Sequence, residues 1–152
     1  MMTRFGWAMG VAALALGSVQ VLACPELTGR YECRMHQGTQ ILNISQELGN
    51  DGFHRYRIET EGAPELVRNV TTDDQWRPVP PVSSPMLQNA RRRAACGDDG
   101  SLLVEVEGER NGNLTNSKHW IYSDATGGLR NLIQTTIENV VGPKSESFCG
   151  RL

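Results

Sequence analysis

The sequence lacks the short motifs that mark common catalytic and metal sites. It contains no Gly-x-Ser-x-Gly element for a nucleophilic serine, no His-x-His or His-Glu-x-x-His pair, and no Cys-x-x-Cys pair for structural zinc. An excess of one charge is also missing, since 15 basic and 17 acidic side chains give a formal net charge of −2. That balance disfavours a general nucleic-acid binder and a polybasic membrane patch. We therefore predict no metal and no cofactor, and favour a non-enzymatic role over an enzymatic one.

One long apolar run is present, and it lies at the N-terminus. Arg4 supplies a positive charge, residues 5–17 are apolar, and Val21-Leu22-Ala23 ends on a small residue before Cys24. A charged start, a short apolar run and a small-residue exit are typical of a secretory signal. We predict that residues 1–23 form a cleaved signal peptide.

The remaining residues, 24–152, suffice for a single domain with its own core. An uncleaved membrane anchor is the weaker alternative, because the more polar Ser18-Val19-Gln20 interrupts the apolar run. After cleavage we expect no membrane span, and we expect the protein to be secreted or periplasmic.

Four cysteines remain after residue 23, and an even number in an exported chain predicts two disulfides: Cys24, Cys33, Cys96 and Cys149. Three pairings are possible, and the sequence does not choose among them. Val21-Leu22-Ala23-Cys24 also resembles a bacterial lipobox, although Leu22 is bulky where that motif prefers a small residue. A lipid on Cys24 would leave one of the other cysteines unpaired, so a lipid anchor is kept as the alternative.

Residues 24–152 alternate short runs of two-residue periodicity with turn signals. Gly49-Asn50-Asp51-Gly52 is the strongest turn, and it joins two alternating runs as a hairpin does. The proline-rich stretch 71–85 predicts a surface loop pinned by Trp76, because proline disfavours helices and central strands. Residues 86–96 fit a strand or a short helix. The remaining predicted strands are 30–36, 39–48, 53–61, 65–70, 101–110, 114–122, 129–141 and 146–151.

This pattern predicts an all-β domain, an antiparallel meander of about eight strands closed as a barrel, with a β-sandwich as the alternative. Closure would place the first strand beside the last and remove both sheet edges. The predicted inward side chains suffice to fill a small barrel but leave little to line a large cavity: Tyr31, Met35, Leu42, Ile44, Tyr56, Ile58, Leu102, Val104, Val106, Ile133 and Ile137.

The segment Cys24-Pro25-Glu26-Leu27-Thr28-Gly29-Arg30-Tyr31 resembles the opening of calycin-type barrels. Lipocalins begin their first strand with Gly-x-Trp and avidins with Leu-Thr-Gly-x-Trp, and here Tyr31 stands in place of the tryptophan. The resemblance implies a calycin-like barrel. Biotin binding does not carry over, because residues 24–152 hold only Trp76 and Trp120. The pattern Cys-Pro-x-Leu-x-Gly-x-Tyr-x-Cys also resembles small exported bacterial proteins of unassigned function.

Arg91-Arg92-Arg93 is the main charge cluster and a candidate contact for an anion or a partner. On a strand, Arg91 and Arg93 share one face and Arg92 points to the other. The alternative is a solvated basic face beside Glu105, Glu107 and Glu109. Trp76, in the proline-rich loop, is a second candidate contact.

Three histidines lie on three different predicted strands, His36, His54 and His119, but their spacing does not require a metal site. His54 directly follows a hairpin turn, so we expect it to be exposed. The leading hypothesis is an exported barrel-like binding protein for a small ligand or a protein partner. An extracytoplasmic hydrolase, or an inhibitor acting through the Trp76 loop, is the alternative.

Overall fold

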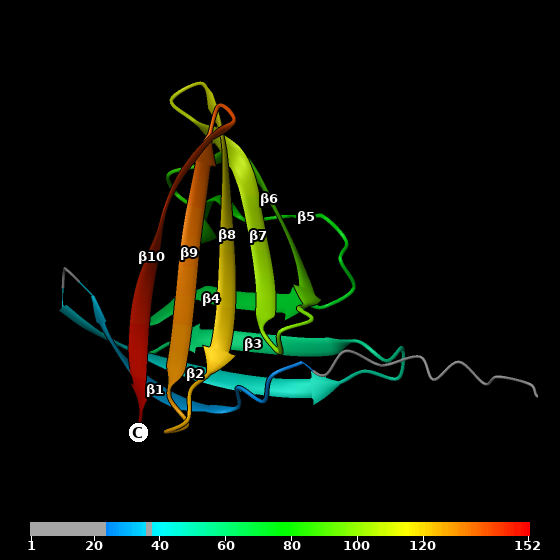
Figure 1. Cartoon of the computed structure of the whole chain (residues 1–152), viewed down its shortest axis with the longest axis vertical. Helices are drawn as coiled ribbons and strands as arrows, with labels where there is room; N and C mark the ends of the chain where they lie inside the picture. Colours follow the sequence, from blue (N-terminus) through cyan, green and yellow to red (C-terminus); the bar gives the residue numbers. More distant parts are fainter. Residues whose placement is uncertain (1–23, 36–37) are drawn as a thin grey trace, which may run out of the picture.

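A computed structural model describes residues 24–35 and 38–152, so the predicted signal peptide and His36 lie outside the described residues. Ten antiparallel strands form one curled sheet, a half-barrel (Figure 1). The strands are β1 (Gly29–Met35), β2 (Gly38–Leu48), β3 (His54–Thr60), β4 (Ala63–Thr71), β5 (Arg77–Pro78), β6 (Gln88–Cys96), β7 (Leu102–Arg110), β8 (Asn113–Ser123), β9 (Leu129–Ile137) and β10 (Val140–Arg151). One short 3-10 helix, η1 (Pro81–Ser83), lies between β5 and β6.

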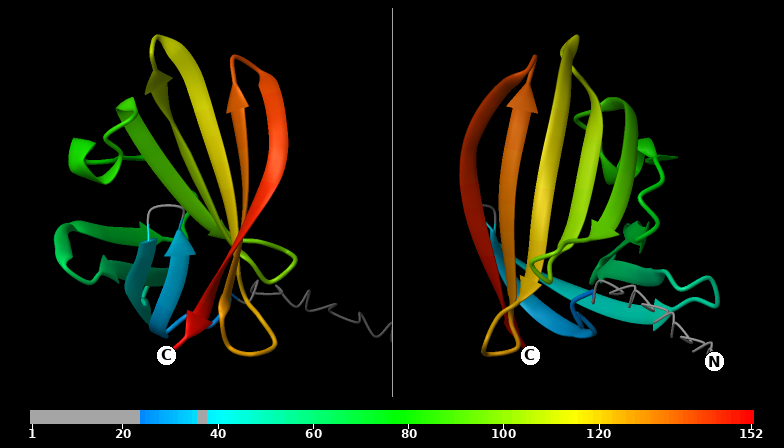
Figure 2. Two further views of the ribbon diagram at one scale, coloured as in Figure 1. Left: turned by 90° about the vertical axis from the view of Figure 1, so that its left-hand side faces the viewer. Right: turned by 45° about the vertical axis from the view of Figure 1, so that its right-hand side comes forward.

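The strand order is β4-β3-β2-β1-β10-β9-β8-β7-β6-β5. The predicted all-β antiparallel meander is confirmed, and β1 pairs with β10 as a barrel-like arrangement requires. Strands β1–β4 lie across the lower ends of β6–β10, so the sheet covers part of its own inner face (Figures 1 and 2). The sheet has ten strands where the periodicity predicted about eight.

The predicted removal of both edges is wrong in the described residues, because the ladder ends at β4 on one side and at β5 on the other. Two contacts join these sides outside the ladder. The backbone N–H of Asp74 donates to the carbonyl of Ala94 at 2.8 Å, and the Arg92 guanidinium donates to the carbonyl of Asn69 at 2.7 Å. The long proline-rich connection between β4 and β6 takes the place that a regular strand pair would have.

The predicted strand 129–141 is two strands. Glu138 and Asn139 both have positive φ, 46° and 66°, so they form a two-residue turn of the kind that favours hairpins. The break predicted between strands 129–141 and 146–151 is also wrong, because Gly142 and Pro143 lie inside β10, where the register shifts between Val141 and Lys144. Proline has no N–H for the ladder, and a bulge accommodates that loss.

The stretch 71–85 is mostly irregular, as its prolines predicted, but it also contains β5 and η1. The ambiguous stretch 86–96 is a strand, β6, paired along β7. A bulge between Gln88 and Arg91 brings this strand close to Gly108, where an added Cβ would lie 2.9 Å from the Gln88 carbonyl oxygen. Gly108 therefore permits the close approach that lets β6 begin beside β7.

The core lies between the β1–β4 layer and the lower half of β6–β9. Tyr31 and Tyr56 are its largest fully buried side chains, and their hydroxyls donate to the carbonyls of Leu27 and Pro25 at 2.9 and 2.8 Å. These bonds tie the segment before β1 to the core and satisfy the polar ends of both rings. Most predicted inward residues are in or against the core, but Ile137 is 43% exposed because it precedes the β9–β10 turn. The side chain of Met35 lies outside the described set.

Two disulfides join the four cysteines, as predicted from their even number: Cys24–Cys96 and Cys33–Cys149. Cys33 lies directly opposite Cys149 across the β1–β10 pair. The bridges span sequence separations of 72 and 116 residues, and loops of that length give about 4–5 kcal/mol each in the chain-entropy model. Both bridges therefore stabilise the junction of the two halves of the sheet.

Candidate functional site

The strand register assigns each side chain to the inner or the outer face of the sheet. Ala94 and Val104 are buried in the core and lie opposite each other, which identifies the inner face of β6 and β7. By the same register, two neighbouring inner rows run across β6–β9: Ala94, Val104, His119 and Ile133 in one, and Arg92, Val106, Ser117 and Thr135 in the other. The first row joins the core at one end and is only partly buried at the other.

Polar side chains from five strands meet on the inner face beside the core. They are Thr60, Arg68, Arg92, His119 and Asn131, and we call them the inner polar patch. Arg68 lies opposite Ile58, and Asn131 lies opposite Ile121, so both arise from rows that begin in or against the core. Arg68, Arg92, His119 and Asn131 are partly buried, and Thr60 is only 6% exposed.

Charge in the inner polar patch is unbalanced. Burial lowers the pKa of Arg68, and burial together with the positive charge of Arg68 lowers the pKa of Arg92. Burial also lowers the pKa of His119, the charge of Arg68 lowers it further, and the Asn131 side chain partly opposes both effects. The lowered pKa values of these three groups show that the inner polar patch places positive charge where water is scarce.

The outer face of the same strands is electrostatically balanced. Arg91 and Arg93 lie over the ring of Trp76, with guanidinium carbons 5.0 and 4.8 Å from its centroid. Arg91 pairs with Glu107, and Arg93 pairs with Glu105 at 2.6 Å and with Asp74 at 3.4 Å. This cluster fastens the proline-rich connection to the outside of β6 and β7.

Glu105 is the centre of the outer cluster, with a side chain only 8% exposed. Burial raises its pKa, but hydrogen bonds from Asn116 and Arg93 outweigh that effect, and Lys118 at 3.7 Å adds to them, so the pKa is lowered overall. Glu105 is therefore ionised in the folded protein at neutral pH, and it contacts two cations, Arg93 and Lys118, and one amide, Asn116.

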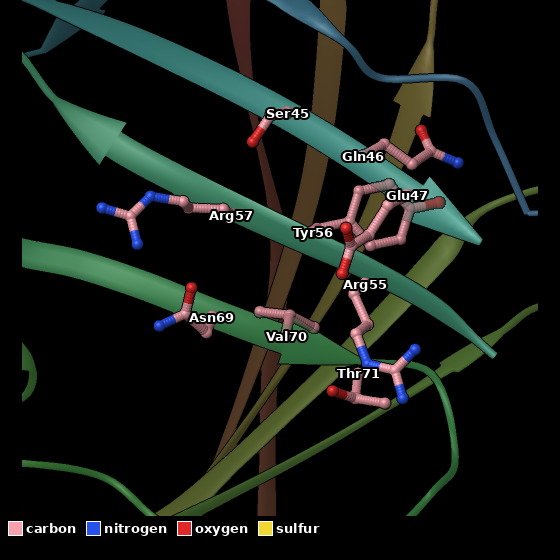
Figure 3. A pocket seen from close by; sticks show the side chains of 9 residues that line it. All are labelled: Ser45, Gln46, Glu47, Arg55, Tyr56, Arg57, Asn69, Val70 and Thr71. Carbon is pink, nitrogen blue, oxygen red and sulfur yellow. The ribbon is translucent and has the colours of Figure 1, made fainter. Parts of the chain in front are cut away.

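A shallow groove of about 340 Å³ crosses the outer face of β2, β3 and β4 (Figure 3). Ser45, Arg57 and Asn69 lie side by side along it, as their register requires. Its two arginines already have carboxylate partners, because Arg55 pairs with Asp51 and Arg57 pairs with Glu59 at 2.6 Å. The groove therefore offers little unsatisfied charge to a ligand.

The predicted arginine cluster is divided between the two faces. The outer pair, Arg91 and Arg93, matches the alternative of a basic face beside Glu105 and Glu107, whereas Arg92 joins the inner polar patch. Sequence analysis missed Thr60, Arg68 and Asn131. Arg68 has a weak signal, since apolar Leu66 and Val70 lie two residues from it on either side, at same-face positions of an alternating run.

The described histidines do not come together on a metal. His54 contacts Gln46 through Nδ1 at 3.1 Å and is partly buried, so the predicted exposure is wrong; its ring stacks 6.4 Å from that of Tyr56. Among residues 24–35 and 38–152, no three His, Cys, Asp or Glu side chains are grouped for a metal ion. The same residues contain no helix long and apolar enough to cross a membrane.

Comparison with known proteins gives no relative from which to transfer a function. No family model, no curated protein and no solved structure matches the chain. The functional argument therefore depends on the geometry and electrostatics of the two sheet faces.

Proposed function

We propose that residues 24–152 form a non-enzymatic binding domain that holds a small ligand against the inner face of β8–β10. One observation carries this proposal: β8, β9 and β10 contribute only Thr115 and Leu129 to the buried residues, although they contain more than a third of the strand residues of the curled sheet. The layer that buries the inner face below, β1–β4, lies across only their lower ends (Figure 2).

The uncovered part of the inner face has the mixed character of a binding surface. Ile133 supplies apolar area, while Ser117 and Thr135 supply hydroxyls 3.1 Å apart. All three are partly buried and none is a member of the buried core. Ligand sites combine such apolar surface with a few polar groups that fix orientation.

The alternatives have less support. A hydrolase needs a nucleophile beside a base and an orienting third group, and His119 has the Arg68 guanidinium and the Asn131 amide beside it instead. An inhibitor acting through the proline-rich connection would use Trp76. Arg91 and Arg93 lie over the ring of Trp76, and these contacts favour a structural role for it.

We also propose that the domain acts outside the cytoplasm after cleavage of residues 1–23, where an oxidising environment maintains both disulfides. The Cys24–Cys96 bridge supports cleavage without lipidation, since a lipid would occupy the same sulfur. Intact-mass measurement of the exported protein tests this. A mass for residues 24–152 less four hydrogens is expected, and an added diacylglyceryl mass would instead establish the lipid anchor.

The binding proposal is tested by screening a fragment library against the ¹⁵N-labelled domain by NMR. We expect hits to shift amides of β8–β10 whose side chains face inward. A matched pair of variants then assigns the face, because Thr135 faces inward and Thr136 faces outward. Thr135→Trp should block the hits and Thr136→Trp should leave them bound; the reverse result, or hits confined to the outer groove, would refute the proposal.

A further inference from the structure

Arg68 and Arg92 differ from the other partly buried arginines of the described residues. Arg55 and Arg93 belong to that group too, and each has a carboxylate partner, Asp51 and Glu105 respectively. Arg68 and Arg92 have none among the described residues. The arginines Arg34, Arg110 and Arg151, which also lack a carboxylate there, are exposed and hydrated by solvent. Among the arginines of residues 24–35 and 38–152, only the inner pair combines partial burial with unneutralised charge.

The described strands place no acid on the inner face that could neutralise them. The residues that the register places there between Arg68 and Ser147 are apolar, hydroxyl, amide or cationic, and every glutamate of β7 points outward with Glu105. The Arg92 guanidinium donates instead to a backbone carbonyl, that of Asn69, at 2.7 Å. A guanidinium has five N–H donors, so most of its donor capacity is left over.

One buried hydroxyl is unpartnered in the same patch. Thr60 Oγ1 makes no hydrogen bond within the described residues. Thr60 lies two residues from Ile58, which is the residue opposite Arg68 across the β3–β4 pair. Buried polar groups without partners are rare in native proteins, and they often indicate an absent bound group.

We infer that Arg68 and Arg92, flanked by Thr60 and His119, form a subsite for the oxyanion of a small ligand, a carboxylate or a phosphate ester. This deepens the proposed function, on which it rests, by naming the ligand class. The geometry that points to it is two guanidiniums from facing strands, β4 and β6, turned to one inner patch without an acid between them.

The chemistry of the groups fits this ligand. An oxyanion accepts charge-assisted hydrogen bonds from both guanidiniums, relieves their mutual repulsion and fills their remaining donor positions. The Thr60 hydroxyl can donate to the same oxygens, which would give its unpartnered atom a bond. His119, neutral in the free protein because its pKa is lowered, gains stability as a cation beside a bound anion.

The probes are inorganic phosphate and octanoate, titrated separately into the ¹⁵N-labelled domain at constant ionic strength. We expect saturable shifts of the Nε–Hε resonances of Arg68 and Arg92 and of the His119 ring, with no saturation at Arg91 and Arg93. Preference for phosphate would assign a phosphate ester, and preference for octanoate a carboxylate with an apolar tail. Saturation by neither probe, or saturation at the outer arginines alone, would overturn the inference.

Arg68→Met removes one guanidinium, and it should weaken the preferred anion at least tenfold, as expected for loss of charged hydrogen bonds. Arg34→Met is the matched control, because it removes the same charge from an exposed outer position of β1 and should leave affinity unchanged. Equal affinity in the wild-type protein and Arg68→Met would overturn the subsite. Neutral fragments that still bind the inner face in that case would preserve the proposed function, so the two failures are distinguishable.

Discussion

The two faces of β6 use three consecutive arginines in opposite ways. On the outer face, Arg91 and Arg93 are neutralised by glutamates of β7 and lie against Trp76. On the inner face, Arg92 meets Arg68 and no acid. On the outer face each arginine has a carboxylate partner within the chain, so the cluster is structural. On the inner face the positive charges of Arg68 and Arg92 have no carboxylate partner among the described residues. The difference shows that arginines of one strand can have opposite electrostatic surroundings, depending on the face of the sheet that each occupies.

The largest effect on the free energy of unfolding is expected at Glu105, the centre of the outer cluster. Glu105→Ala leaves Arg93 with the more distant Asp74 and removes the acceptor for Asn116. Breaking a mostly buried ionic cluster by removing one partner should cost about 2–4 kcal/mol. Urea unfolding at neutral pH measures this. A decrease in the free energy of unfolding below about 0.5 kcal/mol, the level of an ordinary surface pair, would show that the outer cluster does not stabilise the fold.

A smaller effect is expected at Trp76, which joins the proline-rich connection to the same cluster. Trp76→Ala removes two cation–π contacts and partly buried aromatic surface, and should lower stability by about 1–3 kcal/mol. Trp120→Ala is the control, since Trp120 lies outside this cluster and has one cation, Lys144, over its ring. Hydrogen exchange of the Asp74 and Val79 amides, which bond Ala94 and Ala90, should accelerate in Trp76→Ala only.

On the inner face, removing an arginine should raise the free energy of unfolding, where the outer-face substitutions lower it. Arg68→Met removes a partly buried charge that has no carboxylate partner and that disfavours the charge of Arg92. In the absence of ligand we expect stability to rise by about 0.5–1 kcal/mol, as is common where a functional group is replaced by an apolar one. A loss of more than 1 kcal/mol in urea unfolding would mean that Arg68 is a structural residue and that the two faces are alike.

The sequence predicted the outer arrangement better than the inner one, for physical reasons. Alternation in β7 is regular, and because residues 86–96 are a strand, the two-residue period separates Arg91 and Arg93 from Arg92 and places the glutamates of β7 beside the outer pair. Arg68 was missed because its proximity to Arg92 depends on how far the sheet curls, and two-residue periodicity contains no information on curl. The β9–β10 turn was missed because Glu138-Asn139 carries no glycine, while Gly142-Pro143 imitates a turn within a bulged strand.

The smallest expected effect is a step in the free energy of unfolding as the pH falls, caused by protonation of His119 and not shared by the outer cluster. The pKa of His119 is lowered in the folded protein, so the unfolded chain takes up a proton first as the pH falls. The stability associated with neutral His119 is therefore complete above the ordinary histidine pKa, about 6.5, and is lost as the pH falls through the folded value. Glu105 also has a lowered pKa, but its contribution is lost only in the acidic range below the ordinary value of a glutamate, 4.5. Urea unfolding between pH 7.5 and pH 5 should reveal the first step alone, and His119→Gln should remove it.

A bound anion should shrink the step as well, because a negative charge beside the imidazole raises its pKa toward the unfolded value. An unchanged step at saturating anion would separate His119 from the arginine pair and confine the oxyanion to the guanidiniums of β4 and β6.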